Sequence, residues 1–454
     1  MSRAGLGIAV LCTGLAACGS CGKGDAGGGA PSSSASSASP SPVVAELLPR
    51  CRGEAERLAI PGEDVTVGDV AIGAAGLLVG VIRVDGGKRV ASVVRASLDL
   101  AKSSVVDVGP PLGDDPPPSP RWNGTTAYVS FFARHPSDAG AKHRELRVAR
   151  LEPTALGKLE ATVLQQADES TAFDVAWNEA GAGLAAWDED APLKVDRDGG
   201  APAYEGRGFV KVQALGSEAR RVASPESSDA ESPRLLARPG GGFWLGWLAR
   251  RSEESAYAVE APGETRAFRW VEIVALDAKG EAAGPVRRVA SEKGRAASFE
   301  LAASGADLVV MVQDEAAAAD GAGARIVRHL VSGDRVESSD VVDGGVGQAL
   351  AEIVPTSSPG DAARWLAWTD TSERVHMTPL AAGLVASGRA ATEPSLDGAR
   401  VLAAHPPDVL YALVGASPEG EGEAPQRRRP ELRRFVCPTG SEPTTAPRSR
   451  PPAP

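Results

Sequence analysis

The stretch SPRLLARPGGGFWLGWLARR, residues 232–251, contains a short strand-like segment, three glycines and then a strongly apolar segment. Glycine supplies the backbone freedom that a tight turn needs, so the stretch predicts a hairpin of two strands. Three further segments have the same shape: SPRWNGTTAYVSFFARH from Ser119, FDVAWNEAGAGLAAWDED from Phe173 and SFELAASGADLVVMVQDE from Ser298. The chain is therefore expected to repeat one structural unit.

Each predicted hairpin is followed by a polar loop and then by two more strands. The third strand alternates apolar residues with Arg or Lys, as in RELRVARL at 144–151 and RWVEIVAL at 269–276. The fourth is more polar, and its sequence RRVAS occurs at 220–224 and again at 287–291. Apolar second strands are centred near Val79, Val129, Ala185, Leu245, Val310, Ala367 and Tyr411. Third strands are centred near Val93, Val148, Val212, Glu272, Val327, His376 and Arg434.

Short strands at even spacing, separated by Gly turns such as Asn123-Gly124, predict an all-β chain. Seven units of four strands resemble a β-propeller. The first and sixth repeats are the weakest, which leaves six or eight blades as alternatives. The resemblance is to propellers in general, because repeated Gly-His…Trp-Asp, kelch and sialidase signatures are absent. The segment SLDGARVLA at 395–403 resembles the strand turn of TolB-like propellers, with Leu396 at the position where proline is usual.

The segment GEAERLAIP at 53–61 aligns with GSEARRVASP at 216–225, so it reads as a fourth strand without the three before it. The last unit, which ends in ELRRFVC at 431–437, lacks a fourth strand. We therefore expect the N-terminal strand to pair with the C-terminal strand and close the ring, since an open edge strand invites aggregation.

This arrangement accounts for the two cysteines at the ends of the body, Cys51 and Cys437. Cys437 ends a third strand and Cys51 immediately precedes its expected neighbour, so a disulfide between them would join the ends of the ring. Export to an oxidising compartment would allow this bond. Two unrelated buried thiols are the alternative, and Cys21 could compete for either partner.

The N-terminus reads MSRAGLGIAVLCTGLAACGSC, with a positive start at Arg3 and an apolar run of signal-peptide length at 4–17. The sequence Leu15-Ala16-Ala17-Cys18 resembles the lipobox of bacterial lipoproteins, which implies lipidation of Cys18 and a membrane anchor. Gly19, where Asp commonly signals inner-membrane retention, points to the outer membrane. The alternatives are a buried N-terminal helix and an ordinary cleaved signal.

Composition predicts the remaining organisation. Residues 1–17 are assigned to the signal peptide, 18–45 to the lipidated Cys and a flexible Gly/Ser/Pro-rich tether, 46–437 to the propeller and 438–454 to a disordered tail. The net charge of −11 and the pI of about 5.2 argue against a nucleic-acid partner. No run of 18 apolar residues occurs in the body, so no transmembrane helix is expected there.

Catalytic and metal-binding motifs are not found. The five histidines lack metal-ligand spacing, no Cys-x-x-Cys lies in the body, and neither a nucleophile elbow nor a P-loop is present. We therefore expect no metal and no cofactor.

Acidic residues end several second strands, and a candidate acidic rim is formed by Asp188, Asp190, Asp314 and Asp370. The alternatives are that these carboxylates cap strand ends or belong to a glycosidase pair. The tryptophans are expected to pack between blades, with a sugar-stacking surface as the alternative.

The sequence thus predicts a lipid-anchored protein of the cell envelope, with the outer membrane favoured. Its propeller would be a binding or scaffold module for a protein or glycan partner rather than an enzyme. The alternatives are a propeller enzyme that acts on polysaccharide, as a glycoside hydrolase or a lyase, and a structural envelope component.

Overall fold

The computed structural model describes residues 52–111, 115–134, 144–164, 172–190, 208–251, 269–289, 294–314, 325–340, 349–354, 364–369, 374–380, 384, 391–392, 399–405, 409–415 and 429–436. All of them belong to the unit Glu46–Pro454. The predicted signal peptide and tether, Cys18, Cys21, Cys51, Cys437 and the C-terminal tail lie outside the described residues.

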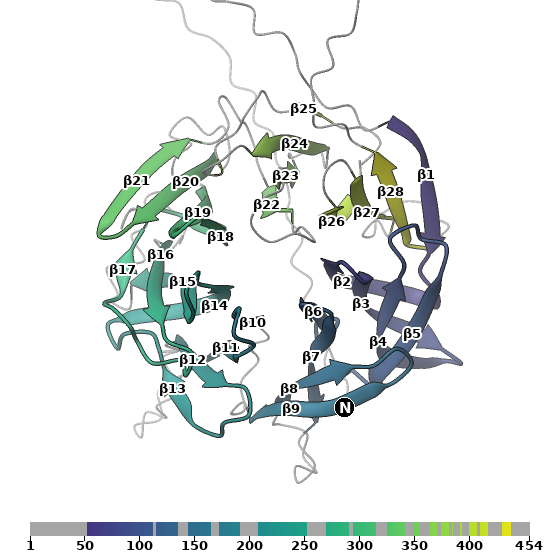
Figure 1. Ribbon diagram of the computed structural model, residues 1–454, viewed down its shortest axis with the longest axis horizontal. Coiled ribbons are helices and arrows are strands. Elements are labelled where there is room, and N and C mark those ends of the chain that lie inside the picture. The colour runs from purple at the N-terminus through teal and green to yellow at the C-terminus, as the bar shows by residue number, and fades with distance from the viewer. Residues whose placement is uncertain are drawn as a thin grey trace, which may run out of the picture. The chain divides into compact units, whose positions relative to one another are not determined.

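The described residues form seven antiparallel sheets of four strands each (Figure 1). We call these sheets blades one to seven, in chain order. The first blade holds β2 (Glu63–Gly73), β3 (Gly76–Asp85), β4 (Lys88–Ala96) and β5 (Ser103–Gly109). The second holds β6 (Ser119–Asn123), β7 (Thr126–Arg134), β8 (Arg144–Leu151) and β9 (Leu156–Leu164). The third holds β10 (Phe173–Trp177), β11 (Gly183–Asp190), β12 (Gly208–Ala214) and β13 (Arg220–Val222).

The fourth blade holds β14 (Ser228–Ala237), β15 (Phe243–Arg251), β16 (Arg269–Leu276) and β17 (Arg287–Arg288). The fifth holds β18 (Ala296–Ser304), β19 (Asp307–Asp314), β20 (Arg325–Ser332) and β21 (Arg335–Asp340). The sixth holds β22 (Ala349–Ile353), β23 (Arg364–Thr369), β24 (Val375–Leu380) and β25 (Ala391–Thr392). The seventh holds β26 (Ala399–His405), β27 (Val409–Val414), β28 (Glu431–Val436) and β1 (Arg52–Ala59).

The seven-bladed β-propeller predicted from the repeats is confirmed, including the first and sixth units. In blades one to six the strands are ordered as they follow in the chain, with the first strand innermost (Figure 1). The seventh blade instead has the order β1-β28-β27-β26, and β1 pairs antiparallel with β28 from Arg52↔Val436 to Ala59↔Glu431. The predicted pairing of the N-terminal and C-terminal strands is therefore present in the fold.

Local sequence explains the hairpins. The turn between β3 and β4 contains Gly86 and Gly87, whose φ angles are 55° and 78°. Two successive positive φ angles define the tight turn that matches the twist of paired strands, and glycine adopts them without strain. Gly124, in the predicted Asn-Gly turn, has a φ of 58°.

The core lies between the blades. Second strands have both faces covered, as in β3, where eight successive residues from Gly76 to Arg83 are buried. Apolar clusters join each blade to the next, and one of them joins the seventh blade to the first through Tyr411, Leu413, Val79 and Val81. The Tyr411 hydroxyl also donates a hydrogen bond of 2.6 Å to the Leu98 carbonyl across this interface. Inner strands of successive blades thus stand side by side around a common centre (Figure 1).

Candidate functional site

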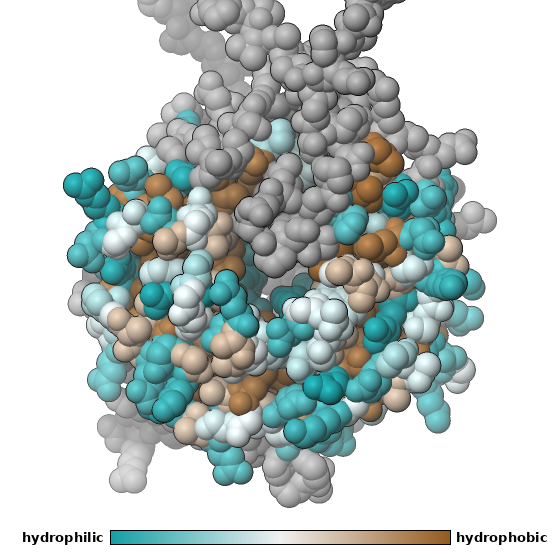
Figure 2. Space-filling model, viewed as in Figure 1, coloured by the Kyte–Doolittle hydropathy of each residue, from teal (hydrophilic) through white to brown (hydrophobic). Residues whose placement is uncertain are grey.

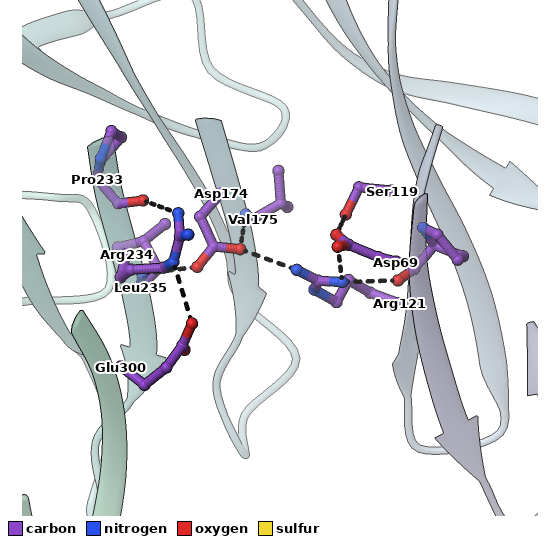
Figure 3. Close-up of polar contacts among 10 residues, drawn as sticks. Asp69, Ser119, Arg121, Asp174, Val175, Pro233, Arg234, Leu235 and Glu300 are labelled. Atoms are coloured by element: carbon purple, nitrogen blue, oxygen red, sulfur yellow. Dashed lines mark hydrogen bonds and ion pairs between the residues drawn. The ribbon is translucent and has the colours of Figure 1, made fainter. Parts of the chain in front are cut away.

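Five charged side chains from five successive inner strands face the centre of the ring. They are Asp69 on β2, Arg121 on β6, Asp174 on β10, Arg234 on β14 and Glu300 on β18, and we call them the central belt (Figure 3). Their charges alternate in sign from blade one to blade five. Figure 2 shows a hollow at the middle of the ring face, with hydrophilic residues beside it. The central belt is therefore the candidate functional site.

One end of the belt is tightly paired (Figure 3). The Arg121 guanidinium lies between two carboxylates, with Nη1 3.2 Å from Asp69 Oδ2 and Nη2 3.4 Å from Asp174 Oδ1. The Ser119 hydroxyl donates a hydrogen bond of 2.6 Å to Asp69 Oδ2. Asp174 is the least exposed of the three charged residues, and its Oδ2 accepts a hydrogen bond of 2.8 Å from the backbone N–H of Leu235. These bonds tie the inner strands of blades one to four together.

The other end of the belt is loosely paired. Arg234 Nε lies 3.8 Å from Glu300 Oε1, which is beyond hydrogen-bond distance. Arg234 Nη1 donates to the carbonyl of Pro233, just as Arg121 Nη1 donates to the carbonyl of Pro120. The Arg234 and Glu300 side chains keep 39% and 35% of their surface exposed. Two opposite charges thus remain open to solvent at the centre of the ring.

The belt shifts the acidity of its members in opposite directions. Burial acts to raise the pKa of Asp69, but the Arg121 guanidinium and the Ser119 hydroxyl outweigh it and hold that pKa below its ordinary value. Burial raises the pKa of Glu300, and the negative charge of Asp174 adds to this rise, while Arg234 opposes it. Glu300 therefore takes up a proton more readily than Asp69 does.

Two of the four residues proposed for an acidic rim have described side chains. Asp188 is buried, and its Oδ2 accepts a hydrogen bond of 2.8 Å from the backbone N–H of Ser232 in the next blade. Asp314 Oδ1 accepts a hydrogen bond of 3.0 Å from the backbone N–H of Arg295. Asp314 thus caps the residue that directly precedes β18, in line with the strand-capping alternative left open by the sequence. Asp188 instead bonds to a residue within β14, where the pairing of that strand is irregular between Glu231 and Arg234. The side chain of Asp190, and the whole of Asp370, lie outside the described residues.

The tryptophans serve mainly in packing, as expected. Trp187 and Trp247 are fully buried, and their indole N–H groups donate to Glu189 and Glu272. Trp177 stacks on Tyr128 of the neighbouring blade with ring centroids 4.3 Å apart. Within the described ranges, His, Cys, Asp and Glu form no group of three that could hold a metal ion. The same part of the chain contains no helix long and apolar enough to cross a membrane.

The central belt was not predicted from the sequence. A signal for it exists in the triplet Ser-Pro-Arg, which stands at 119–121 and again at 232–234 in equivalent inner strands. Asp174 and Glu300 likewise interrupt apolar inner strands. Strand alternation alone does not reveal that these residues meet, because their neighbours come from blades about 50–65 residues away.

Comparison with known proteins finds similar folds among solved structures but no matching family. No protein-family model and no curated protein matches the chain. Among solved structures, polysaccharide lyase Uly1 is similar with a TM-score of 0.50 and 9% identity, over 88% of this chain and 94% of that one. The β-propeller domain of the trilobed protease from Pyrococcus furiosus has a TM-score of 0.47 and 12% identity, over 83% and 94% of the two chains. At such identities the likeness concerns the fold alone, which the seven four-stranded sheets already identify as a β-propeller.

Proposed function

We propose that this protein is a lipid-anchored binding module of the cell envelope, whose propeller engages a protein or glycan partner at the centre of one ring face. The observation that supports this proposal is the central belt. Charged groups that served only to hold strands together would be expected to hydrogen-bond directly, as Arg121 does with Asp69 and Asp174. Arg234 and Glu300 instead stand 3.8 Å apart and remain over one-third exposed. They offer a donor and an acceptor to a ligand.

The envelope location rests on the lipobox-like sequence Leu15-Ala16-Ala17-Cys18, with acylation of Cys18 as the anchor. Residues 19–42 are rich in Gly, Ser, Ala and Pro, a composition typical of a flexible tether. Gly19 after the lipidated position favours the outer membrane. Such an anchor would hold the propeller within reach of envelope partners.

The partner is tested by capture from intact cells. The tagged full-length protein is cross-linked in the cells, purified in mild detergent and compared with an unrelated lipoprotein bait, and co-purified proteins and glycans are identified by mass spectrometry. The proposal expects one stoichiometric partner, with protein cross-links mapping to the face that contains the hollow. If the protein recovers nothing beyond the control bait, the binding function is wrong.

The anchor is tested separately by fractionation. Cys18→Ala is expected to move the protein from the membrane fraction to the soluble fraction and to abolish labelling by a fatty-acid probe. A variant that stays membrane-bound and labelled would exclude Cys18 as the lipidated residue. Cys21→Ala is the matched control, because it removes a neighbouring thiol and leaves the lipobox intact.

A second candidate is an enzyme that acts on polysaccharide, as a glycoside hydrolase or a lyase. It is favoured by the central belt, which brings the carboxylates of Asp69 and Glu300 into one cluster and shifts their pKa values in opposite directions, because acid and base roles are commonly divided between carboxylates of different acidity. Incubation with a panel of polysaccharides, followed by assays for new reducing ends and unsaturated products, tests it. Cleavage that is lost in Glu300→Gln would establish this alternative.

A further inference from the structure

The two arginines of the central belt, Arg121 and Arg234, differ in their carboxylate partners. Both follow Ser-Pro on equivalent inner strands, and both donate to the carbonyl of the preceding proline. Arg121 has carboxylate oxygens within 3.4 Å on both sides. Arg234 has one carboxylate, Glu300, at 3.8 Å. Asp174, on the inner strand that precedes that of Arg234, directs its Oδ2 to the Leu235 backbone N–H. Among the described residues, Arg234 therefore has one carboxylate fewer within 4 Å than its counterpart Arg121.

We propose that the Arg234–Glu300 end of the central belt binds a hydroxy-carboxylate, with the guanidinium holding the ligand carboxylate and Glu300 accepting a hydrogen bond from the adjacent hydroxyl. Guanidinium matches the planar geometry of a carboxylate and can bind it through two parallel hydrogen bonds. Such a ligand would supply the second carboxylate that Arg121 already has. This inference rests on the proposed binding function and names the chemistry of its ligand.

Charge balance explains why the ligand must bring a hydroxyl as well as an anion. The belt contains three carboxylates and two guanidinium groups, so it carries a net charge of −1 when all are ionised. A plain anion would be attracted by Arg234 and repelled by Glu300. A hydroxyl next to the carboxylate turns the Glu300 contact into a hydrogen bond to an ionised acceptor, which is stronger than one between neutral groups.

Two sources share this chemistry: a sugar acid at the end of a glycan, and a small free hydroxy acid. Isothermal titration of the purified full-length protein with glucuronate and with lactate separates them. Glucose is the matched probe without a carboxylate, and acetate is the probe without a hydroxyl. The proposal expects binding of at least one hydroxy-carboxylate, with glucose and acetate about tenfold weaker or worse. Equal affinity for acetate would overturn the role of the hydroxyl.

Point substitutions test whether Arg234 binds the ligand. Arg234→Gln is expected to weaken binding about tenfold or more. Arg221→Gln, which removes an arginine from the exposed ion pair with Glu281, is expected to bind as the wild type does. Circular dichroism and thermal unfolding establish that both variants are folded. Unchanged affinity in a folded Arg234→Gln would show that the loose pair belongs to the scaffold alone.

The pH dependence gives a second readout. The described charged groups that face Glu300 are Arg234, Asp174, Arg121 and Asp69. A proton on Glu300 would remove both the negative charge that repels a plain anion and the ionised acceptor of the ligand hydroxyl, so the affinity advantage of a hydroxy-carboxylate over acetate is expected to shrink as the pH falls from 7 to 5. Glu300→Gln should bind with the same relative affinity for these two ligands at both pH values. A pH dependence of the relative affinity in this variant equal to that of the wild type would contradict the proposed role of Glu300.

If envelope capture recovers a partner but Arg234→Gln binds it normally, this inference fails and the proposed binding function stands.

Discussion

The buried carboxylate of Glu272 holds two indole groups in the fourth blade. Its oxygens accept hydrogen bonds of 3.1 Å from Trp247 Nε1 and 3.0 Å from Trp270 Nε1. An amide at this position would place an NH₂ group against one indole N–H and leave that donor without an acceptor. Glu272→Gln is therefore expected to lower the free energy of unfolding by about 2 kcal/mol. Urea denaturation followed by tryptophan fluorescence measures the change.

The control for this prediction is Glu281→Gln, which alters an exposed ion pair with Arg221. Exposed pairs contribute little, so its stability should remain within about 0.5 kcal/mol of the wild type. Equal stabilities of the two variants would show that the indole groups do not depend on the Glu272 charge.

His329 predicts a pH-dependent stability. The ring is buried in β20, with Nδ1 2.8 Å from Ser338 Oγ. Burial lowers the pKa of His329 from 6.5 to about 4, although Asp314 acts against this shift. The native state thus binds fewer protons than the unfolded chain between these values, and stability should fall as the pH drops from 6.5 to about 4. The loss attributable to this residue amounts to up to about 3 kcal/mol.

Urea denaturation across pH 7 to 4 tests this prediction in the wild type and in His329→Gln. The variant should lose less stability over this range, because glutamine does not titrate. His405→Gln, which retains His329, is the control for the loss of an imidazole elsewhere in the fold. Parallel curves for wild type and His329→Gln would mean that His329 does not contribute to the acid sensitivity.

Close approach of strands fixes the spacing between the first two blades. A Cβ atom added at Gly80 of β3 would lie 1.7 Å from the backbone oxygen of Pro118, at the entry to the second blade. No rotation of a side chain can relieve a contact with backbone. Gly80→Ala is therefore expected to destabilise the protein by about 3 kcal/mol, at the upper end of overpacking effects.

Gly284→Ala is the matched control, because the added methyl group would meet nothing within 4 Å and no positive φ applies there. Its thermal midpoint should stay near that of the wild type. If Gly80→Ala unfolds at the same temperature as Gly284→Ala, the second blade can move away from the added methyl group at little cost in free energy.

The elements of this fold were predictable because their signals are local. Every predicted second-strand centre, from Val79 to Tyr411, falls within an observed second strand, and every predicted third-strand centre falls within a third strand. Apolar runs and glycine turns encode these strands without reference to the rest of the chain. The partner of Arg121 could not be predicted in the same way. Asp69 and Asp174 become its neighbours only when blades one, two and three assemble.

The same limit applies to Asp188. Its position at the end of a second strand was visible in the sequence, and this favoured an acidic rim. That its carboxylate reaches the Ser232 N–H depends on how the third blade packs against the fourth. Patterns within one unit thus predict strands, whereas contacts between units decide what a polar side chain does.

The whole ring depends on how its two ends are joined. The pairing of β1 with β28 reaches Arg52↔Val436. In the sequence, Cys51 immediately precedes Arg52 and Cys437 immediately follows Val436. A disulfide between these two cysteines would therefore join the chain directly beyond the pairing of β1 with β28. We propose a Cys51–Cys437 disulfide, which an oxidising compartment would allow and which would stabilise the fold by roughly 5 kcal/mol in the chain-entropy model.

Non-reducing peptide mapping of protein isolated from the envelope tests this bond, with thiols blocked during lysis. The expected product is a cross-linked peptide containing Cys51 and Cys437. The double variant Cys51→Ser with Cys437→Ser should unfold at a lower temperature than the wild type, and reducing agent should lower the wild type to the same point. Cys21→Ser, which leaves both partners in place, should match the wild type under both conditions. A Cys21–Cys51 peptide would instead mean that pairing of β1 with β28, and not a covalent bond, holds the two ends together.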